Sequence, residues 1–235
     1  MIDTTFNMHS DANGGDPDST SPTLRKYHKL LWRKNLPNGK FFELHENRNT
    51  SYLWHNSSLG EFSLGSDAIT HSYKNHERKK WLTSQIPEDV NELFNLGSTI
   101  GASIIFPNKQ VDRKNTINQA RGCSQLIDDR FDLTLECIKR FYNNKSNNPL
   151  EDAFERYKRF FQLFDNFQGY VEFFLLEDLV DDKGEIKFYL PFDNFQSIPK
   201  FTNKEEYILY KNKVIHFIEC RNRRIDKYIK ELKNN

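Results

Sequence analysis

The spacing of apolar residues along the chain predicts both helices and strands. Apolar positions that recur every three or four residues predict helices at residues 23–34, 87–96, 116–142, 150–164 and 204–232. Compact or alternating apolar runs predict strands at residues 40–45, 51–55, 61–64, 68–73, 102–106, 170–176 and 186–192. These elements do not alternate strictly, so we expect a single α+β domain over residues 1–235. Its sheet would be antiparallel or mixed, packed on a long central helix and a long C-terminal helix.

The predicted helix at residues 116–142 has the most unusual pattern. At about 100° per residue, Arg121, Asp128, Asp132 and Glu136 fall on one charged stripe with apolar residues on both sides. A helix that is apolar on two flanks is expected to pack on both of them. The stripe would then line a cleft or form an internal ion-pair network instead of facing open solvent.

Two interpretations of this stripe remain open. The carboxylates of Asp128, Asp132 and Glu136 are candidates to bind a divalent cation such as Mg²⁺ or to act as catalytic acids and bases. A cluster of like charges also raises the pKa of one of its carboxyl groups. The alternative is a network of buried salt bridges to the C-terminal helix, with Arg221 and Arg224 as the partners.

A second group of candidates lies in residues 52–76. Gly65-Ser66-Asp67 has the composition of a tight polar turn between strands, and His71 follows four residues after Asp67. Because ligand-binding residues are often carried on loops held by a scaffold, Ser66, Asp67, His71 and His55 are candidates to contact a polar ligand. The chain has no Gly-x-Ser-x-Gly elbow, so a hydrolase triad is not supported. The alternative is an ordinary turn with solvated histidines.

The N-terminal segment, residues 1–21, is rich in Asp, Gly, Ser and Asn and is predicted to be loop. Ser21-Pro22 is typical of a helix start. Arg25 and His28 follow at the beginning of that helix, a placement that suits an anion held at the helix end. The alternative for the two cations is plain surface. The glycines and acidic groups of residues 11–19 are candidates to wrap over a ligand or to cap the helix that follows, and the alternative for them is an ordinary loop.

Composition excludes some classes of function. Net charge is +1, from 34 Lys and Arg against 33 Asp and Glu, so no global field attracts nucleic acid or an anionic membrane. No apolar run reaches the roughly 18–20 residues of a membrane span, and the N-terminus lacks a signal-peptide pattern. The three cysteines are far apart and form no zinc-ligand spacing. We therefore expect a cytoplasmic protein, with a nucleic-acid role unlikely on charge alone.

Two functions from different classes fit these features. In the first, the protein binds or processes a nucleotide or another small phosphorylated ligand in a cleft beside the central helix. Arg25 and Arg121 would bind phosphate, since guanidinium groups form paired hydrogen bonds to it. On this hypothesis Asp132→Asn abolishes binding and changes the free energy of unfolding by no more than about 1 kcal/mol. In the second, the chain is a non-enzymatic interaction protein, for example a partner or inhibitor in a bacterial or phage conflict system.

Several phrases of the sequence together resemble an uncharacterised prokaryotic family, domain of unknown function number 6994. They are DPDSTSPTLRKYHKLLW, SLGSDAITHSY, IGASIIFPNK, TINQARG, DDRFDLTLECIKRFY, GYVEFFLLEDLV and FIECRNRRID. The resemblance extends over nearly the whole chain, which favours one domain. It implies no activity and assigns no catalytic residue.

Overall fold

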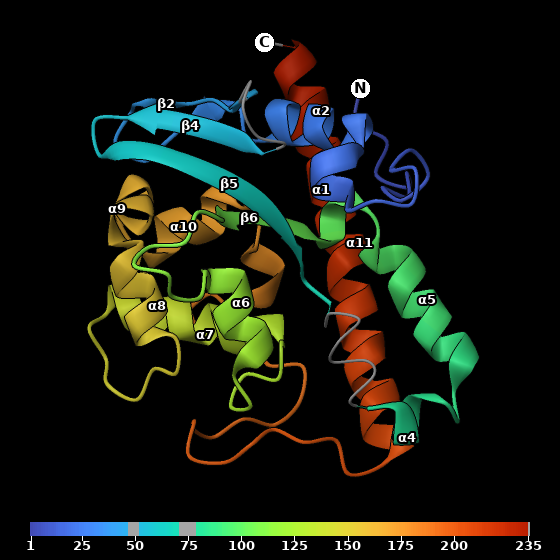
Figure 1. Cartoon of the computed structure of the whole chain (residues 1–235). Coiled ribbons are helices and arrows are strands. Elements are labelled where there is room, and N and C mark those ends of the chain that lie inside the picture. The colour runs from blue at the N-terminus through green and yellow to red at the C-terminus, as the bar shows by residue number, and fades with distance from the viewer. Residues whose placement is uncertain (47–51, 71–78, 235) are drawn as a thin grey trace.

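Two antiparallel sheets and a set of helices make up the computed structural model, which describes residues 1–46, 52–70 and 79–234 (Figure 1). The predicted α+β class is confirmed. The helices are α1 (Pro17–Thr20), α2 (Pro22–Leu31), α4 (Lys80–Thr83), α5 (Pro87–Gly97), α6 (Ile117–Cys123), α7 (Phe131–Tyr142), α8 (Glu151–Arg156), α9 (Lys158–Phe161), α10 (Phe167–Phe173) and α11 (Lys204–Asn234). Short 3₁₀ helices are η1 (Ile100–Ala102), η2 (Gln162–Phe164) and η3 (Glu177–Leu179).

The larger sheet has four strands in the order β3 (His45–Glu46), β4 (Leu53–Ser57), β5 (Gly60–Ala68) and β6 (Ser103–Pro107). A smaller sheet pairs β1 (Lys34–Asn35) with β2 (Phe41–Phe42). Every pairing is antiparallel. Helices α9 and α10 lie beneath the curved larger sheet in Figure 1, and the long strand β5 runs from above α9 toward α11.

β5 continues through Gly65, Ser66 and Asp67, so the predicted turn at these residues is wrong. The cause is the partner strand, because Ser66 pairs with Ile105 and Asp67 with Ile104 of β6. The fully buried β6 keeps the whole segment in the antiparallel ladder. Ser66 and Asp67 are therefore held on a strand and not on a loop.

The predicted central helix is also wrong as a single element. It is divided into α6 and α7 by residues 124–130, and Asp128 and Asp129 there have φ angles of 49° and 60°. These left-handed conformations cannot continue a right-handed helix, and aspartate tolerates them better than most residues do. A capping box of Thr116 and Gln119 starts α6 at the expected position. The proposed stripe therefore does not exist as one helical face.

The aromatic segments after residue 150 differ most from expectation. Residues 170–176, predicted as a strand, lie largely in α10, where the Asn166 side chain caps the helix by accepting from the Gly169 N–H. Residues 186–192 form only an isolated bridge, between Val180 and Ile186. The helix predicted at residues 150–164 is broken into α8, α9 and η2. An apolar run of this length does not distinguish a buried helix from a buried strand.

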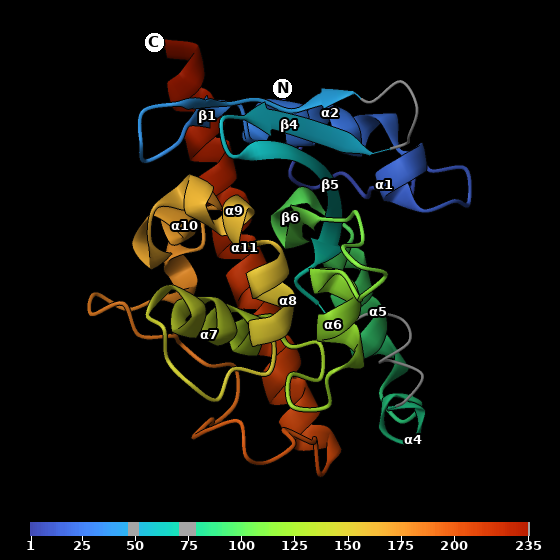
Figure 2. The same ribbon diagram turned by 60° about the vertical axis from the view of Figure 1, so that its left-hand side comes forward.

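The predicted helices at residues 87–96 and 204–232 are confirmed as α5 and α11. α11 runs the length of the molecule in both views, with α5 beside it (Figures 1 and 2). Arg221, fully buried on α11, donates to the backbone carbonyl oxygens of Gly101, Ser103 and Phe174 at 2.8–3.2 Å. This side chain thus holds η1, β6 and the end of α10 against α11.

Candidate functional site

The N-terminal loop is folded onto the start of α2 by its own acidic residues. Asp11 accepts from the Ser21 hydroxyl at 2.5 Å and from the Thr23 N–H at 3.0 Å, and Ser21 in turn accepts from the Leu24 N–H. The Thr23 and Leu24 N–H groups are backbone donors at the helix start that the helix cannot satisfy by itself. The helix-capping interpretation of this loop is therefore confirmed.

Short helix α1 brings Asp18 from this loop against strand β5. The Asp18 carboxylate accepts from the Ser66 N–H at 2.9 Å and from the Ser66 hydroxyl at 2.7 Å. Gly65 permits this approach, because a Cβ there would lie 2.7 Å from Asp18 Oδ2. Burial raises the pKa of Asp18 to about 6, although the hydrogen bonds from Ser66 act in the opposite direction. A pocket of about 200 Å³ opens beside Asp18, Ser66 and Asp67.

Arg121 of α6 connects β5 with the segment before α7. Its guanidinium is fully buried and forms an ion pair with Asp67. It also donates to the Thr134 hydroxyl at 2.9 Å and lies 3.7 Å from Asp129 Oδ1. Burial lowers the pKa of Arg121, while the charge of Asp129 raises it. Because its donors are turned to protein acceptors, Arg121 is positioned to hold β5 and α7 together.

The two left-handed aspartates form contacts on different sides of this segment. Asp129 faces Arg121. Asp128 forms an ion pair with Lys79, whose Nζ lies 2.8 Å from each of the two carboxylate oxygens. A left-handed conformation costs energy in a residue other than glycine, so the contacts around Asp128 and Asp129 must stabilise it. The turn therefore joins the buried Arg121 network to a second, more open region.

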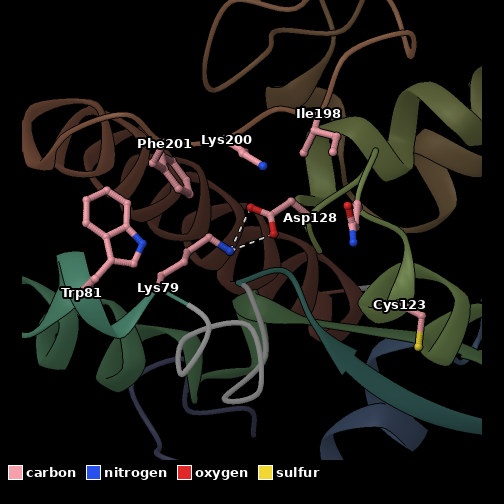
Figure 3. A pocket seen from close by; sticks show the side chains of 8 residues that line it. Lys79, Trp81, Cys123, Asp128, Ile198, Lys200 and Phe201 are labelled. Carbon is pink, nitrogen blue, oxygen red and sulfur yellow. Dashed lines mark hydrogen bonds and ion pairs between the residues drawn. The ribbon is translucent and has the colours of Figure 1, made fainter.

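That region is a pocket of about 480 Å³. The described residues that line it are Lys79, Trp81, Cys123, Gln125, Asp128, Ile198, Lys200 and Phe201 (Figure 3). We call it the Asp128 pocket. Trp81, on α4, has 58% of its surface exposed, and Ile198 has 39%, so two large apolar side chains stand open at its edge. Its volume falls in the range of roughly 300–1,000 Å³ that is usual for small-molecule sites.

The Asp128 pocket combines one carboxylate with two ammonium groups. Burial raises the pKa of Asp128, and the neighbouring Lys79 lowers it. Lys200 is exposed, and its side-chain ammonium group has no hydrogen bond or ion pair to another described residue. Figure 3 shows Lys79 and Lys200 reaching toward Asp128 from two separate segments. The pocket therefore provides a free cation, a paired cation, a carboxylate and exposed aromatic surface.

Asp132 is placed differently from Asp128. It is fully buried, pairs with Arg130 through two hydrogen bonds, and accepts from the Tyr189 N–H at 2.9 Å. Both of its oxygens are used inside the protein, so it does not line a cleft. The salt-bridge interpretation is correct for Asp132, but its partner is Arg130.

Glu136 and the two arginines expected as its partners also lie apart. Glu136 pairs with Arg140 one turn later on α7 at 2.7 Å. Arg221 contacts backbone carbonyl oxygens, and Arg224 pairs with Asp178 at 2.9 Å. The expected network between the stripe and the C-terminal helix is therefore wrong, because both arginines have other partners.

The predicted histidines do not converge on either pocket. His28 is buried, accepts from the Trp32 indole N–H at 3.0 Å, and has a pKa lowered to about 3 by burial and by nearby Arg221. His55 is buried on β4, stacks on Phe42 with ring centroids 4.0 Å apart, and has a pKa lowered by burial. Neither is placed to meet a ligand. His71 lies outside the described residues.

Arg25 is the one predicted N-terminal residue that stays near a pocket. Its Nη1 donates to the Asp18 carbonyl oxygen at 3.4 Å, which places its charge beside the Asp18 carboxylate. Contacts therefore connect Arg25 to Ser66 through Asp18, and Asp67 to Asp129 through Arg121. Asp128, next to Asp129 in the sequence, lines the other pocket. In the described ranges, no group of three or more His, Cys, Asp or Glu side chains is arranged to hold a metal ion.

Sequence reasoning missed Lys79, Trp81 and Lys200. These residues come from segments that are far apart in the sequence and that meet only in the folded chain. The one local signal is Trp81 itself, a large aromatic side chain next to the basic run at residues 78–80. Asp18 was also missed as a partner of Ser66, because the contact spans 48 residues.

Comparison with known proteins adds a family and no activity. The model of a family of unknown function (DUF6994) matches residues 2–225. No curated protein and no solved structure matches the chain. In the described part of the chain, no helix combines the length and apolar character needed to cross a membrane.

Proposed function

Since the chain belongs to the family of unknown function DUF6994, we propose its function from the geometry of the Asp128 pocket. We infer that this pocket binds a small phosphorylated ligand, and that the ligand is a nucleotide. The observation that carries the proposal is the presence of exposed Trp81, and of a Lys200 ammonium group that pairs with no described residue, at one pocket that also contains the Lys79–Asp128 ion pair.

Each part of a nucleotide has a matching group in the pocket. An indole ring stacks on a base without regard to its identity, and such stacking is worth about 1–3 kcal/mol per base. Lys200 has its charge available for a phosphate. Lys79 donates to Asp128 but retains a positive charge within reach of the same space. A ligand with a flat ring and a phosphate would therefore use both kinds of surface at once.

Asp128 is the candidate acid–base group of this site. Its pKa is raised by burial, which is the environment that general acids require. Lys79 opposes this effect by lowering the pKa, and a phosphate that attracts Lys79 would weaken that opposition. The reaction class that follows is hydrolysis or transfer at phosphate, with Asp128 in contact with the reacting groups.

The test is a binding titration of the purified full chain with ATP, ADP, AMP, adenosine and inorganic phosphate. We expect a nucleotide to quench the fluorescence of Trp81, with nucleosides and phosphate each binding more weakly. Lys200→Gln should weaken nucleotide binding by about tenfold, a loss of about 1.4 kcal/mol. Lys183→Gln, an exposed lysine in the turn after η3, is the matched control and should change nothing.

A companion variant separates the two contributions. Trp81→Leu should remove the preference for nucleotides over inorganic phosphate and leave the weak binding of phosphate intact. A nucleotide at 100 times its dissociation constant should also raise the free energy of unfolding by about 2.7 kcal/mol. Absence of nucleotide binding by the unaltered chain at millimolar concentration would contradict the proposal.

A second candidate function, a non-enzymatic interaction protein, rests on the exposure of Trp81 and Ile198 at one edge. Exposed tryptophans are frequent among the residues that contribute most to protein interfaces. On this hypothesis a defined protein partner would be lost with Ile198→Ser, while Lys200→Gln would have little effect. The ligand proposal predicts the reverse order, so the two variants discriminate between the functions.

A further inference from the structure

α11 carries a cluster of chemically active side chains away from the Asp128 pocket. Cys220 Sγ lies 3.6 Å from Nε2 of His216, one helical turn earlier. Arg223 Nη2 donates to the same sulfur at 3.0 Å. A basic imidazole and a guanidinium therefore meet one thiol. The positions are set by helix geometry alone, since residues three and four apart share a face.

The cluster opens onto a pocket of about 470 Å³, which we call the Cys220 pocket. Leu179, Phe188 and Phe217 give it apolar walls, and Lys187 and Lys213 also line it. A pocket with these apolar walls favours small ligands that are largely apolar, and such ligands would lie next to the Cys220 thiol. The ammonium groups supply hydrogen-bond donors for a carbonyl oxygen.

The other two cysteines provide an internal contrast. Cys137 is fully buried, and burial raises the pKa of its thiol well above the usual value. Cys123 is exposed, and its thiol forms no hydrogen bond with any described residue. Only Cys220, among the three, has both a nearby base and a cationic donor. The His216 nitrogen is placed to take the thiol proton as the sulfur attacks, and Arg223 is placed to donate to the sulfur.

We propose that Cys220 is a nucleophilic thiol that adds to a small apolar α,β-unsaturated carbonyl compound held in the Cys220 pocket. His216 Nε2 takes the thiol proton, and the sulfur forms a bond to the β-carbon of the ligand. The carbon–carbon double bond becomes single as its electron pair moves toward the carbonyl group. The proton on His216 then passes to the α-carbon, so the thioether product contains every atom of both reactants.

The first experiment compares two thiols within one protein. The full chain is treated with limiting N-ethylmaleimide, itself a compound of this class, and the labelled peptides are quantified by mass spectrometry. Although Cys220 is less exposed than Cys123, we expect it to react about tenfold faster, because a nearby base that takes the thiol proton activates the nucleophile. Equal rates, or a faster Cys123, would overturn the proposal.

Three exposed substitutions on α11 test the roles within the cluster. His216→Gln and Arg223→Gln should each slow Cys220 labelling by about fivefold and leave Cys123 unchanged, since the first removes the base and the second the donor that contact the sulfur. Glu219→Gln, adjacent in sequence but without a contact to the sulfur, is the control. Rates that stay constant in the first two variants would overturn the assignment of the base and the donor.

The role of the pocket has its own test. Replacing N-ethylmaleimide by N-phenylmaleimide adds a ring that the apolar walls can accommodate. The ratio of the two rates should be about threefold higher at Cys220 than at Cys123, consistent with burial of modest apolar area. Identical ratios at the two thiols would show that the pocket contributes nothing to selection.

Discussion

Asp128 and Asp132 are four residues apart, both paired with a cation, and placed in opposite environments. Asp132 and Arg130 have 0% and 2% of their side-chain surfaces exposed, and the carboxylate also accepts a backbone N–H. Asp128 and Lys79 retain 18% and 10%, and both line a pocket. The first pair has its hydrogen-bonding capacity used by the protein. The Lys79–Asp128 pair is partly exposed to the pocket, so a ligand there can form hydrogen bonds with it.

The contrast shows why a count of clustered charges does not identify a site. Arg121 and Arg221 resemble Asp132 in environment, because each is fully buried and donates to acceptors of the protein itself. Lys200 belongs with Asp128, because its charge faces the pocket without an ion-pair partner among the described residues. Burial together with unused donors and acceptors separates the two groups.

The largest expected effect comes from Asp132→Asn. It removes one member of a buried ion pair and leaves Arg130 charged, so the free energy of unfolding should fall by about 3–5 kcal/mol. This replaces the value of no more than about 1 kcal/mol expected from the sequence. Urea denaturation followed by circular dichroism measures it, and Asp128→Asn is the control, with an expected loss of about 1 kcal/mol. Equal losses in both variants would remove the distinction between the pairs.

Arg221→Met should have the next largest effect. The methionine fills part of the volume but leaves the carbonyl oxygens of Gly101, Ser103 and Phe174 without this donor. Unsatisfied buried acceptors are costly, and we expect a loss of about 2–3 kcal/mol in the same denaturation assay. Lys200→Met, at an exposed position, should change stability by less than about 0.5 kcal/mol. A small effect at Arg221 would mean that its contacts are replaced by water.

These differences also define how much the sequence can predict. Residues 87–96 and 204–232 have regular helical spacing and clear starts, so they were predicted correctly. Residues 170–176 are apolar almost throughout, and only tertiary packing makes α10 a helix. The break at Asp128–Asp129 depends on two left-handed residues that periodicity does not reveal.

The candidate site was also predictable only in part, because it too depends on contacts between segments that are distant in the sequence. Asp128 was identified by residue type and does line the Asp128 pocket, whereas Ser66, Asp67 and Arg121 form contacts outside it. Lys200 is distant from Asp128 along the chain, so no spacing rule connects the two. Residue type indicates which chemistry a side chain can perform. Which other side chains lie next to it depends on how distant segments pack in the folded chain.

A pH experiment sharpens the contrast at a third carboxyl group, Asp18. Its pKa is raised from 3.8 to about 6 by burial, so the folded protein binds this proton more tightly than the unfolded chain does. The associated stability is complete below pH 3.8 and is lost as the pH rises through about 6. Compared with Asp18→Asn, the unaltered chain should lose about 1–2 kcal/mol more between pH 4 and pH 7. If the stability of the two proteins changed with pH in the same way, the raised pKa of Asp18 would be contradicted.

The smallest expected effect belongs to Glu136→Gln. Glu136 pairs with Arg140 on one helix face, and Arg140 also donates to the carbonyl oxygens of Ser146 and Asn147. Removing the charge should therefore cost only about 0.5 kcal/mol. Nucleotide titration should give the same affinity for this variant as for the unaltered chain, because Glu136 lines neither the Asp128 pocket nor the pocket beside Asp18. A large loss of affinity with this small loss of stability would mean that Glu136 acts at the ligand after all, and that the buried and open acidic groups are not separate.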